Sequence, residues 1–325
     1  MSRSAKQASI NSQITPRSLS RTLILIGDPW ALQILKEAFF GVRRFHDFQT
    51  RLGISRQTLM LRLERFTDNA IFYKAPVKYE RVVYEYRLTP KGADLYTFIL
   101  MIWRLHRRWH LGASILPESL YHRSCGHSMD VNMQCSACKA ALLPESVDYE
   151  PGPGFDPLEE EPLRRTRIVN ELERLGPNYL ATVVMGDCWS VLVLNAVLRG
   201  MENFDAIRKA LQISSNVLSA RLRTLLTLEL LTQEQSQEDG RKLSYQATVK
   251  GRDVYPLIIS LIQWGDRWLA GSMGPPDLLW HKSCGQVLQP AVYCDGCGEQ
   301  LRIDDVSLKP IGRTGSHAGD AAKSN

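Results

Sequence analysis

An internal repeat with a constant offset constrains this chain more than any other feature. The tetrapeptide Gly-Asp-Pro-Trp at residue 27 recurs as Gly-Asp-Cys-Trp at residue 186, an offset of 186 − 27 = 159 residues. The same offset relates His122, Cys125, Cys135 and Cys138 to His281, Cys284, Cys294 and Cys297 without a gap. Self-similarity at a fixed period indicates a repeated architecture. Each copy is therefore expected to be one folding module, and the chain a tandem duplication.

Composition is that of an ordinary globular protein, with 44% hydrophobic and 23% charged residues among 325. The net charge of +6 is compatible with a polyanionic partner but does not specify one. No apolar run reaches about 18 residues, so no membrane span is expected. The basic N-terminal segment also lacks the apolar stretch of a secretory signal. We therefore expect a cytoplasmic protein, in which closely spaced cysteines favour metal binding over disulfides.

Each copy shows the same predicted order of elements. In the second copy, helices are expected at 183–198, at 205–211 and from the N-cap Ser214 to about 228. Two strands flanking the Asp239-Gly240 turn signal follow, and then a helix capped by Thr248. The first copy repeats this order, with helices at 30–40, at 44–52 and from Ser55 to about 67, strands at 72–75 and 82–87, and a helix capped by Thr89. A short helix, a turn, a second helix and a hairpin together predict a winged helix-turn-helix.

The predicted fold class is α+β, mainly α, with two winged helix-turn-helix domains that are each followed by a small zinc-ribbon-like knuckle. Prolines and glycines between the copies exclude a helix or a central strand there and indicate a linker. The expected boundaries are a disordered basic tail at 1–22, winged domain 1 at 23–114, ribbon 1 at 115–147, a linker at 148–163, winged domain 2 at 164–273, ribbon 2 at 274–308 and a disordered tail at 309–325.

Three recurring motifs carry a resemblance to a known family. They are Gly-Asp-x-Trp, Ile-Ser-x-x-x-Leu-x-x-Arg-Leu and Tyr-x-x-Thr-x-Lys-Gly. Together they resemble the HxlR type of winged helix-turn-helix regulator, a branch of the MarR-like group, over about residues 23–109 and 179–268. The resemblance implies DNA binding and control of transcription. Members are usually single-domain chains that dimerise, whereas this chain carries two copies and could supply both halves itself.

The third helix of each copy is the predicted DNA-reading element, because its outer face carries short polar and cationic side chains that suit the major groove. The wings could add phosphate contacts. The candidate DNA-binding residues are Ser55, Arg56, Gln57, Arg62, Arg65, Lys78 and Arg81 in the first copy, and Ser214, Ser215, Asn216, Ser219, Arg221, Arg223, Arg241 and Lys242 in the second. Lys74 also lies in the first wing, whereas the second wing carries Glu234, Glu238 and Asp239, so the first copy is expected to dominate the electrostatic attraction. The alternative is that these faces are only solvated.

The histidine and cysteine spacing predicts two metal sites. Each copy has a His-x-x-Cys pair and a Cys-x-x-Cys pair separated by nine residues. Cys3His is a standard structural zinc set, and two-residue gaps let both ligands of a pair reach one ion. We therefore expect two structural zinc ions per chain, one from the four ligands of each copy, with free thiols or a redox disulfide as alternatives. His127 has no counterpart ligand and is interpreted as a bystander. Cys188 aligns with Pro29 on an apolar helix, which favours a buried inert thiol over a redox sensor.

The function predicted from these features is a sequence-specific DNA-binding transcriptional regulator that uses two winged modules on double-stranded DNA. The alternative is a protein-interaction adaptor built from the same modules. An enzyme is not expected, because the chain lacks a phosphate-binding glycine loop and its metal sites have no open position. Both a homodimer and an intrachain pseudo-dimer stay open, and no effector ligand or membrane partner is indicated.

Overall fold

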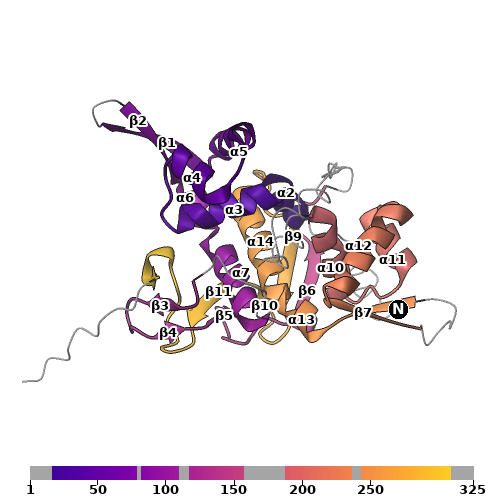
Figure 1. Ribbon diagram of the computed structural model, residues 1–325. Helices are drawn as coiled ribbons and strands as arrows, with labels where there is room; N and C mark the ends of the chain where they lie inside the picture. Colours follow the sequence, from indigo (N-terminus) through magenta and orange to yellow (C-terminus); the bar gives the residue numbers. More distant parts are fainter. Residues whose placement is uncertain (1–16, 79–81, 110–116, 157–186, 236–242, 309–325) are drawn as a thin grey trace, which may run out of the picture.

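A computed structural model describes residues 17–78, 82–109, 117–156, 187–235 and 243–308 (Figure 1). The predicted wing residues Arg81, Arg241 and Lys242 lie outside these ranges, as do residues 157–163 of the predicted linker and the predicted tail at 309–325. No helix among the described residues is long and apolar enough to cross a membrane.

The first winged unit follows the predicted order. Its helices are α3 (Pro29–Phe39), α4 (Phe45–Leu52), α5 (Arg56–Asp68), the short α6 (Pro90–Ala93) and α7 (Tyr96–Trp109). The wing is the antiparallel pair β1 (Phe72–Lys78) and β2 (Val82–Leu88). The Ser55 hydroxyl accepts a hydrogen bond from the Thr58 amide at 3.1 Å, which confirms Ser55 as the cap of α5.

The second winged unit has the same elements 159 residues later. Its helices are α10 (Cys188–Leu198), α11 (Phe204–Leu211), α12 (Ser215–Thr227), α13 (Val249–Asp253) and α14 (Tyr255–Trp268). The wing strands are β7 (Leu231–Gln235) and β8 (Leu243–Ala247). Leu59, Leu63, Leu218, Leu222 and Leu225 are all buried, as their spacing on the third helices predicts.

The N-terminal helix α2 (Arg17–Ile26) corrects the expected tail at 1–22 over residues 17–22, and the rest of that tail lies outside the described residues. Leu19, Leu23 and Ile26 form an apolar stripe that is at most 1% exposed. This stripe packs on α14 of the other copy, where a Cβ at Gly265 would lie 2.5 Å from the Ser18 carbonyl oxygen. The basic residues of this segment suggested a tail, whereas the apolar stripe gives α2 a face to bury.

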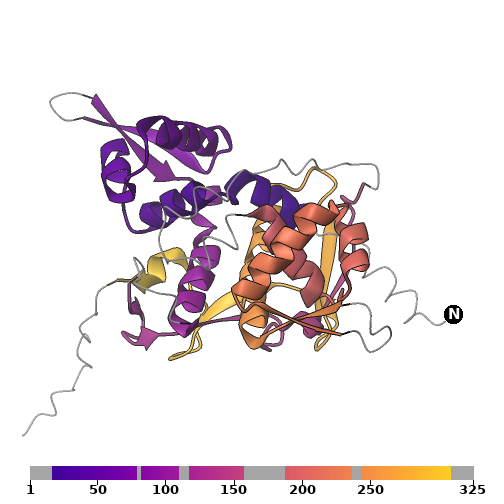
Figure 2. The ribbon, with the colours of Figure 1, turned by 45° about the vertical axis from the view of Figure 1, so that its right-hand side comes forward.

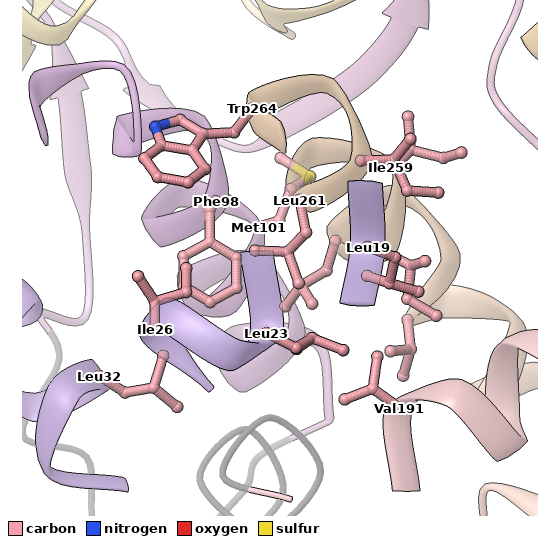
Figure 3. Close-up of a cluster of buried hydrophobic side chains, with 14 of the residues drawn as sticks. Leu19, Leu23, Ile26, Leu32, Phe98, Met101, Val191, Ile259, Leu261 and Trp264 are labelled. Atoms are coloured by element: carbon pink, nitrogen blue, oxygen red, sulfur yellow. The ribbon is translucent and has the colours of Figure 1, made fainter. Parts of the chain in front are cut away.

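Side chains from both copies share one buried cluster (Figure 3). Phe98 and Met101 of α7 lie with Leu261 and Trp264 of α14, and α2 lies against them. The contact of α7 with α14 places the last helices of the two copies side by side within one chain (Figures 1 and 2). The shared core joins the two copies through apolar burial, the dominant favourable contribution to most associations.

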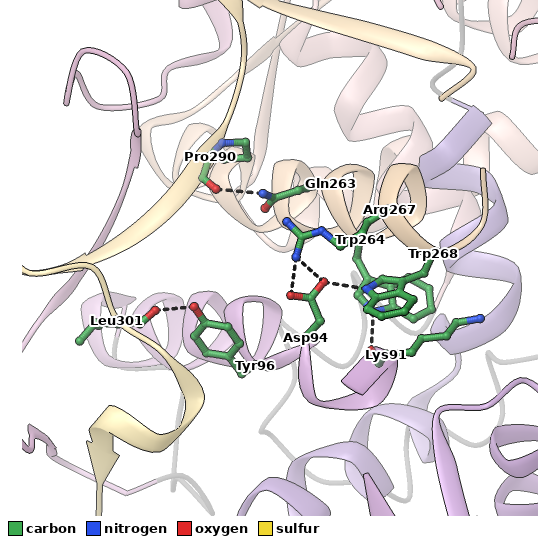
Figure 4. A network of polar contacts seen from close by, with 9 residues as sticks. All are labelled: Lys91, Asp94, Tyr96, Gln263, Trp264, Arg267, Trp268, Pro290 and Leu301. Atoms are coloured by element: carbon green, nitrogen blue, oxygen red, sulfur yellow. Dashed lines mark hydrogen bonds and ion pairs between the residues drawn. The ribbon is translucent and has the colours of Figure 1, made fainter. Parts of the chain in front are cut away.

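Polar contacts reinforce the junction of the copies (Figure 4). Asp94 accepts hydrogen bonds from Arg267 at 2.7 Å and from the Trp268 indole at 2.8 Å. The Trp264 indole donates to the Lys91 carbonyl at 2.9 Å, and the Tyr96 hydroxyl donates to the Leu301 carbonyl. These contacts join α6 and the start of α7 in the first copy to α14 and the segment after it in the second.

The segments after the winged units exchange strands between the copies. The first supplies β3 (Leu120–His122), β4 (Ser128–Met129), β5 (Val131–Cys135) and β6 (Val147–Pro151), and the second supplies β9 (Asp277–His281), β10 (Gln286–Val287), β11 (Pro290–Cys294) and β12 (Val306–Ser307). Short 3-10 turns at Pro144–Ser146 and Ile303–Asp305 precede β6 and β12. The sheets are β11-β5, β12-β3-β4 and β10-β9-β6, so each one includes strands of both copies.

Two sequence expectations about these segments need correction. The linker expected from residue 148 instead begins as strand β6, which pairs with β9 of the other copy. Because β6 lies at the edge of its sheet, its Pro151 is compatible with pairing. The two segments also do not fold as separate ribbons, because their strands pair with each other. A pattern repeated along the chain did not reveal which copy would complete each sheet.

Candidate nucleic-acid interface and metal centres

The N-terminal end of α5 is an exposed polar surface in the first copy. Ser55, Arg56 and Gln57 are exposed there, as the sequence predicts for a helix that enters a major groove. The Arg56 guanidinium lies 5.5 Å from the centre of the Phe45 ring, a contact that links α5 to α4. Met60 and Leu61 extend this face and are 43% and 49% exposed. Sequence reasoning passed over both, although apolar side chains can contact thymine methyl groups.

The corresponding surface on α12 is more polar. Ser214, Ser215 and Asn216 are exposed at its N-terminal end, and Arg223 is exposed further along. Ser219 is half-buried. Hydroxyl and amide groups can hydrogen-bond to base edges, so this helix also has the side chains that direct readout requires.

Arg62 and Arg221 are engaged within the protein, which counts against the sequence prediction that they contact DNA. The Arg62 Nε lies 2.9 Å from an Asp28 carboxylate oxygen, and the Arg221 Nε lies 2.6 Å from Asp187. Asp28 also caps α3, accepting from the Ala31 amide at 3.0 Å. Asp187 caps α10 in the same way, through the Ser190 amide at 3.0 Å. The Gly-Asp-x-Trp aspartate and the third-helix arginine are thus two halves of one ion pair.

Arg65 is also engaged within the protein, because its guanidinium donates to the Ile24 backbone carbonyl of α2. This contact fixes α5 against the N-terminal helix. Sequence spacing placed Arg62, Arg65 and Arg221 on the polar side of their helices. The spacing did not show that the capped end of the first core helix, or α2, would pack against that polar side.

The first wing combines cationic and apolar groups. Lys74 is exposed, and its ammonium lies 5.7 Å from the centre of the Tyr86 ring. Tyr73, Val82 and Tyr84 are also exposed on this hairpin, at 46%, 58% and 56%. Lys78 ends strand β1. In the second wing, the described part includes exposed Glu234.

The eight predicted metal ligands form two clusters, but each cluster draws on both copies. His122 and Cys125 lie with Cys294 and Cys297, and Cys135 and Cys138 lie with His281 and Cys284. The ligand atoms of each cluster lie within 4.8 Å of one another. The expectation that the four ligands of each copy form one site is therefore wrong. The cause is the exchange of β5 and β11, which carries each Cys-x-x-Cys pair to the opposite copy.

The donor geometry fits a tetrahedral ion. The His122 Nδ1 lies 3.3 Å from the Cys125 sulfur and 3.2 Å from the Cys297 sulfur, and the Cys125 and Cys294 sulfurs are 3.9 Å apart. In the second cluster the corresponding distances from the His281 Nδ1 are 3.4 Å to Cys284 and 3.3 Å to Cys138. Zinc–sulfur bonds of about 2.3 Å imply edges of about 3.8 Å in a tetrahedron. Both clusters therefore have the ligand types and spacing of a Cys3His site.

Each ligand pair closes with the same backbone turn. The residue after the second ligand has positive φ at Gly126, Lys139, Gly285 and Gly298, with values of 69°, 62°, 66° and 74°. The amide of this residue donates back to the carbonyl of the first ligand, as from Gly126 to His122 at 2.7 Å. Three of the four positions are glycine, which adopts this conformation without strain. The repeated turn aims both side chains of a pair at one point.

His127 lies beside the first cluster without joining it. Its ring lies against Gly296, where an added Cβ would come within 3.0 Å of the imidazole nitrogen. Cys188 is 6% exposed at the start of α10, which agrees with the predicted buried thiol. Its sulfur donates to the Leu23 carbonyl at 3.4 Å.

Comparison with known proteins finds a family match for both winged units. The model of the HxlR-like helix-turn-helix family matches residues 25–112 and 184–273. An HTH-type transcriptional regulator of Mycobacterium tuberculosis is 38% identical over 138 residues, which cover 42% of this chain and 87% of the relative. One from Synechocystis is 30% identical over 82 residues, covering 25% of this chain and 61% of the relative.

Among solved structures, a candidate transcription factor is 27% identical, with a TM-score of 0.34, and the match covers 38% of this chain and 87% of that one. The family match takes in more than half of the chain and falls on the two units that carry α5 and α12. The chain belongs to the HxlR-like helix-turn-helix family of DNA-binding transcriptional regulators, and it carries the family's domain twice in tandem.

Proposed function

We propose that this chain is a sequence-specific regulator in which two winged modules of one polypeptide act as an intrachain pseudo-dimer on double-stranded DNA. In this arrangement α5 and α12 read two half-sites. Paired helix-turn-helix units address half-sites about one helical turn apart, roughly 34 Å. The pseudo-dimer replaces the second chain that a single-domain relative would need.

The observation that carries the proposal is the crossed pairing of the metal-ligating residues. Each Cys3His cluster takes two ligands from each copy, so neither copy completes a site without the other. The packing of α7 on α14 and of α2 on α14 joins the same two halves. Two halves joined in this way would hold the reading helices α5 and α12 at a fixed separation.

Two zinc ions per chain would fill a structural role in this proposal. His122, Cys125, Cys294 and Cys297 would hold one ion, and Cys135, Cys138, His281 and Cys284 the other. Four protein ligands leave no open position for substrate, so we assign these centres to stability and not to catalysis. Glu299 lies 3.8 Å from the His122 Nε2, where it would orient the imidazole from the outer shell.

The two modules would contribute unequally to DNA affinity. The first copy exposes Arg56 and Lys74, whereas the second exposes Asn216 and Arg223 on its reading helix and Glu234 on its wing. Cations supply the salt-dependent attraction to phosphates, and hydrogen-bonding groups near the helix N-terminus read bases. We therefore assign most of the electrostatic affinity to the first copy.

The test is selection of bound duplexes from a random DNA library at about 0.15 M salt, where nonspecific binding is already weak. The expected result is a motif with two half-sites bound by one chain. Arg56→Ala should relax one half-site and Asn216→Ala the other, each by about 1–3 kcal/mol. Lys282→Ala is the matched control. It removes a cation that is ion-paired with Asp148 in the strand-exchanged region, and it should leave the motif unchanged.

Two outcomes would count against the proposal. A motif with one half-site per chain would exclude the intrachain pseudo-dimer and favour association of two chains. No enriched motif from a folded, fully metal-loaded protein would instead favour the adaptor function, in which the same faces bind proteins.

A further inference from the structure

A cavity of about 320 Å³ lies beside α14 in the second copy. Its apolar walls include Ile259, Ile262, Leu278, Leu279 and Leu288. Two carboxylates, Asp266 of α14 and Asp277 of β9, also line it. Ligand sites are typically concave and mostly apolar, with a few polar groups that fix orientation. The cavity has that composition, and it lies away from the reading helices.

The first copy shows what occupies the corresponding position there. The offset of 159 residues aligns Ile262 with Trp103 (262 − 159 = 103) and Asp266 with Arg107 (266 − 159 = 107). Trp103 is 3% exposed, and its indole donates to the Pro117 carbonyl at 2.7 Å. The Arg107 guanidinium lies 5.3 Å from the centre of the Trp103 ring and donates to the Met129 carbonyl at 3.2 Å. An aromatic ring with a cation over it therefore lines this place in the first copy, where the cavity that remains is only about 100 Å³.

The second copy carries a smaller side chain and the opposite charge at these two positions. Isoleucine in place of tryptophan removes the volume of an aromatic ring, and aspartate in place of arginine substitutes a negative group for a positive one. Gln263 and Arg267, which also border the cavity, bind the Pro290 carbonyl at 3.0 Å and Asp94 at 2.7 Å. Figure 4 shows both side chains, which project from α14, turned to these partners.

The two carboxylates differ in how far their charge is compensated. Asp277 is 1% exposed, and one oxygen accepts from the Arg17 amide at 2.7 Å, while the other has no hydrogen-bond partner in the described part of the chain. Asp266 accepts from the Ser18 hydroxyl. Burial raises the pKa of Asp266 to about 7, and the charge of Asp277 acts in the same direction. Backbone hydrogen bonds from Arg17 and Ser18, and the charges of Arg199 and Arg17, oppose the effect of burial on the pKa of Asp277, whereas the Ser18 hydroxyl opposes it at Asp266.

We propose that this cavity binds an organic cation with an apolar or aromatic body, with Asp266 as the principal counter-ion. The ligand would supply to the second copy the ring and the positive charge that Trp103 and Arg107 supply to the first. A buried carboxylate is costly unless it is paired, so a cation gains more here than a neutral ligand of the same shape. The site lies outside the DNA-reading faces and does not depend on the proposed function.

The experiment is a calorimetric titration of the full-length, metal-loaded protein with benzyltrimethylammonium, an aromatic ion with a permanent positive charge. Benzyl alcohol and benzoate serve as neutral and anionic comparisons. The expected result is one benzyltrimethylammonium bound per chain, with weaker or no binding of the other two. Asp266→Asn should weaken binding by at least about tenfold, the loss expected when a charged partner is removed.

A second variant tests the cavity independently of the charge. Ile262→Trp restores the ring that the first copy carries and should block the site, whereas Asp205→Asn removes an exposed carboxylate on α11 and should change nothing. Cooperative thermal unfolding of each variant would show that the fold is kept. The proposal is overturned if the parent does not bind the cation, if it binds benzyl alcohol as strongly, or if both Asp266→Asn and Ile262→Trp bind as the parent does.

Discussion

The two copies of the winged module differ little in their framework and strongly at their surfaces. Both pair the Gly-Asp-x-Trp aspartate with a third-helix arginine, at 2.9 Å in the first copy and 2.6 Å in the second. By contrast, Trp103 and Arg107 correspond to Ile262 and Asp266, and exposed Lys74 corresponds to Gln233. What recurs is what each module needs in order to fold. What differs indicates where the two modules have separate tasks.

The Thr-x-Lys-Gly motif shows why some positions recur. A Cβ added at Gly92 would lie 2.1 Å from the Ile71 carbonyl oxygen, and one at Gly251 would lie 2.1 Å from that of Leu230. Any side chain would push the helix away from the wing, so glycine is required by close backbone approach. The motif therefore reports on packing and not on DNA contact.

Crossed and separate metal centres predict opposite results for two double variants, and this is the largest expected effect. Cys125→Ser/Cys294→Ser disables one crossed cluster and should leave about one zinc per chain, whereas Cys125→Ser/Cys135→Ser disables both clusters. Structural zinc contributes about 10–16 kcal/mol of folding free energy in small peptides. The second variant should therefore lose the ordered packing of strands β3–β6 and β9–β12. Zinc content by mass spectrometry and thermal unfolding would measure both effects.

Each double variant is the matched control of the other, because both remove two thiols. If Cys125→Ser/Cys135→Ser kept about one zinc and Cys125→Ser/Cys294→Ser kept none, each copy would hold its own ion. The exchange of strands between the copies would then be incorrect.

The recurring aspartate–arginine pair should contribute to stability in both copies. Arg221→Ala leaves the buried Asp187 carboxylate unpaired and should cost about 3–5 kcal/mol of unfolding free energy. Arg62→Ala should cost less, because the Arg62 side chain is 28% exposed compared with 15% for Arg221. Urea unfolding would measure both. Loss of DNA binding in Arg62→Ala at unchanged stability would instead restore a direct contact with DNA.

Acid should stabilise the second copy through Asp266 and Asp277, whose counterparts in the first copy are Arg107 and Glu118. The pKa values of the two aspartates are raised by burial to about 7 and about 6 from 3.8, so the folded state binds more protons than the unfolded state between those limits. The unfolding free energy from these groups should fall as pH rises from 4 to 8, by a few kcal/mol as an order of magnitude. Asp266→Asn should flatten this dependence in urea unfolding measured across the same range. An unchanged slope would show that Asp266 is solvated.

Cys188 in the second copy, where the first has Pro29, should give the smallest effect. The thiol is buried and donates to the Leu23 carbonyl, so peroxide should reach it slowly. Cys188→Ser keeps a donor at this position and should change stability by about 1 kcal/mol or less. DNA binding before and after peroxide, in the parent and in Cys188→Ser, would test this. A response that vanished in the variant would make Cys188 a sensor.

The sequence by itself determined the repeat, the order of elements in each module, the caps Ser55, Thr89 and Thr248 and the identity of the eight candidate ligands, whereas the Ser214 side chain makes no capping hydrogen bond. Those features are local: N-caps, apolar spacing and ligand pairs act within a few residues, so their pattern can be read along the chain. Ser55 as a cap and Leu59 and Leu63 as core residues followed from spacing alone.

The tertiary structure alone decided which copy completes each site. The ligand pairs of a duplicated chain are chemically equivalent, so His122 could pair with Cys135 or with Cys294 until the strands β5 and β11 are placed. The role of Arg62, the burial of α2 and the cavity opened by Ile262 and Asp266 depend equally on contacts between distant segments. Local pattern fixes what each segment can form, whereas the choice of partner depends on how all segments bury their apolar faces together.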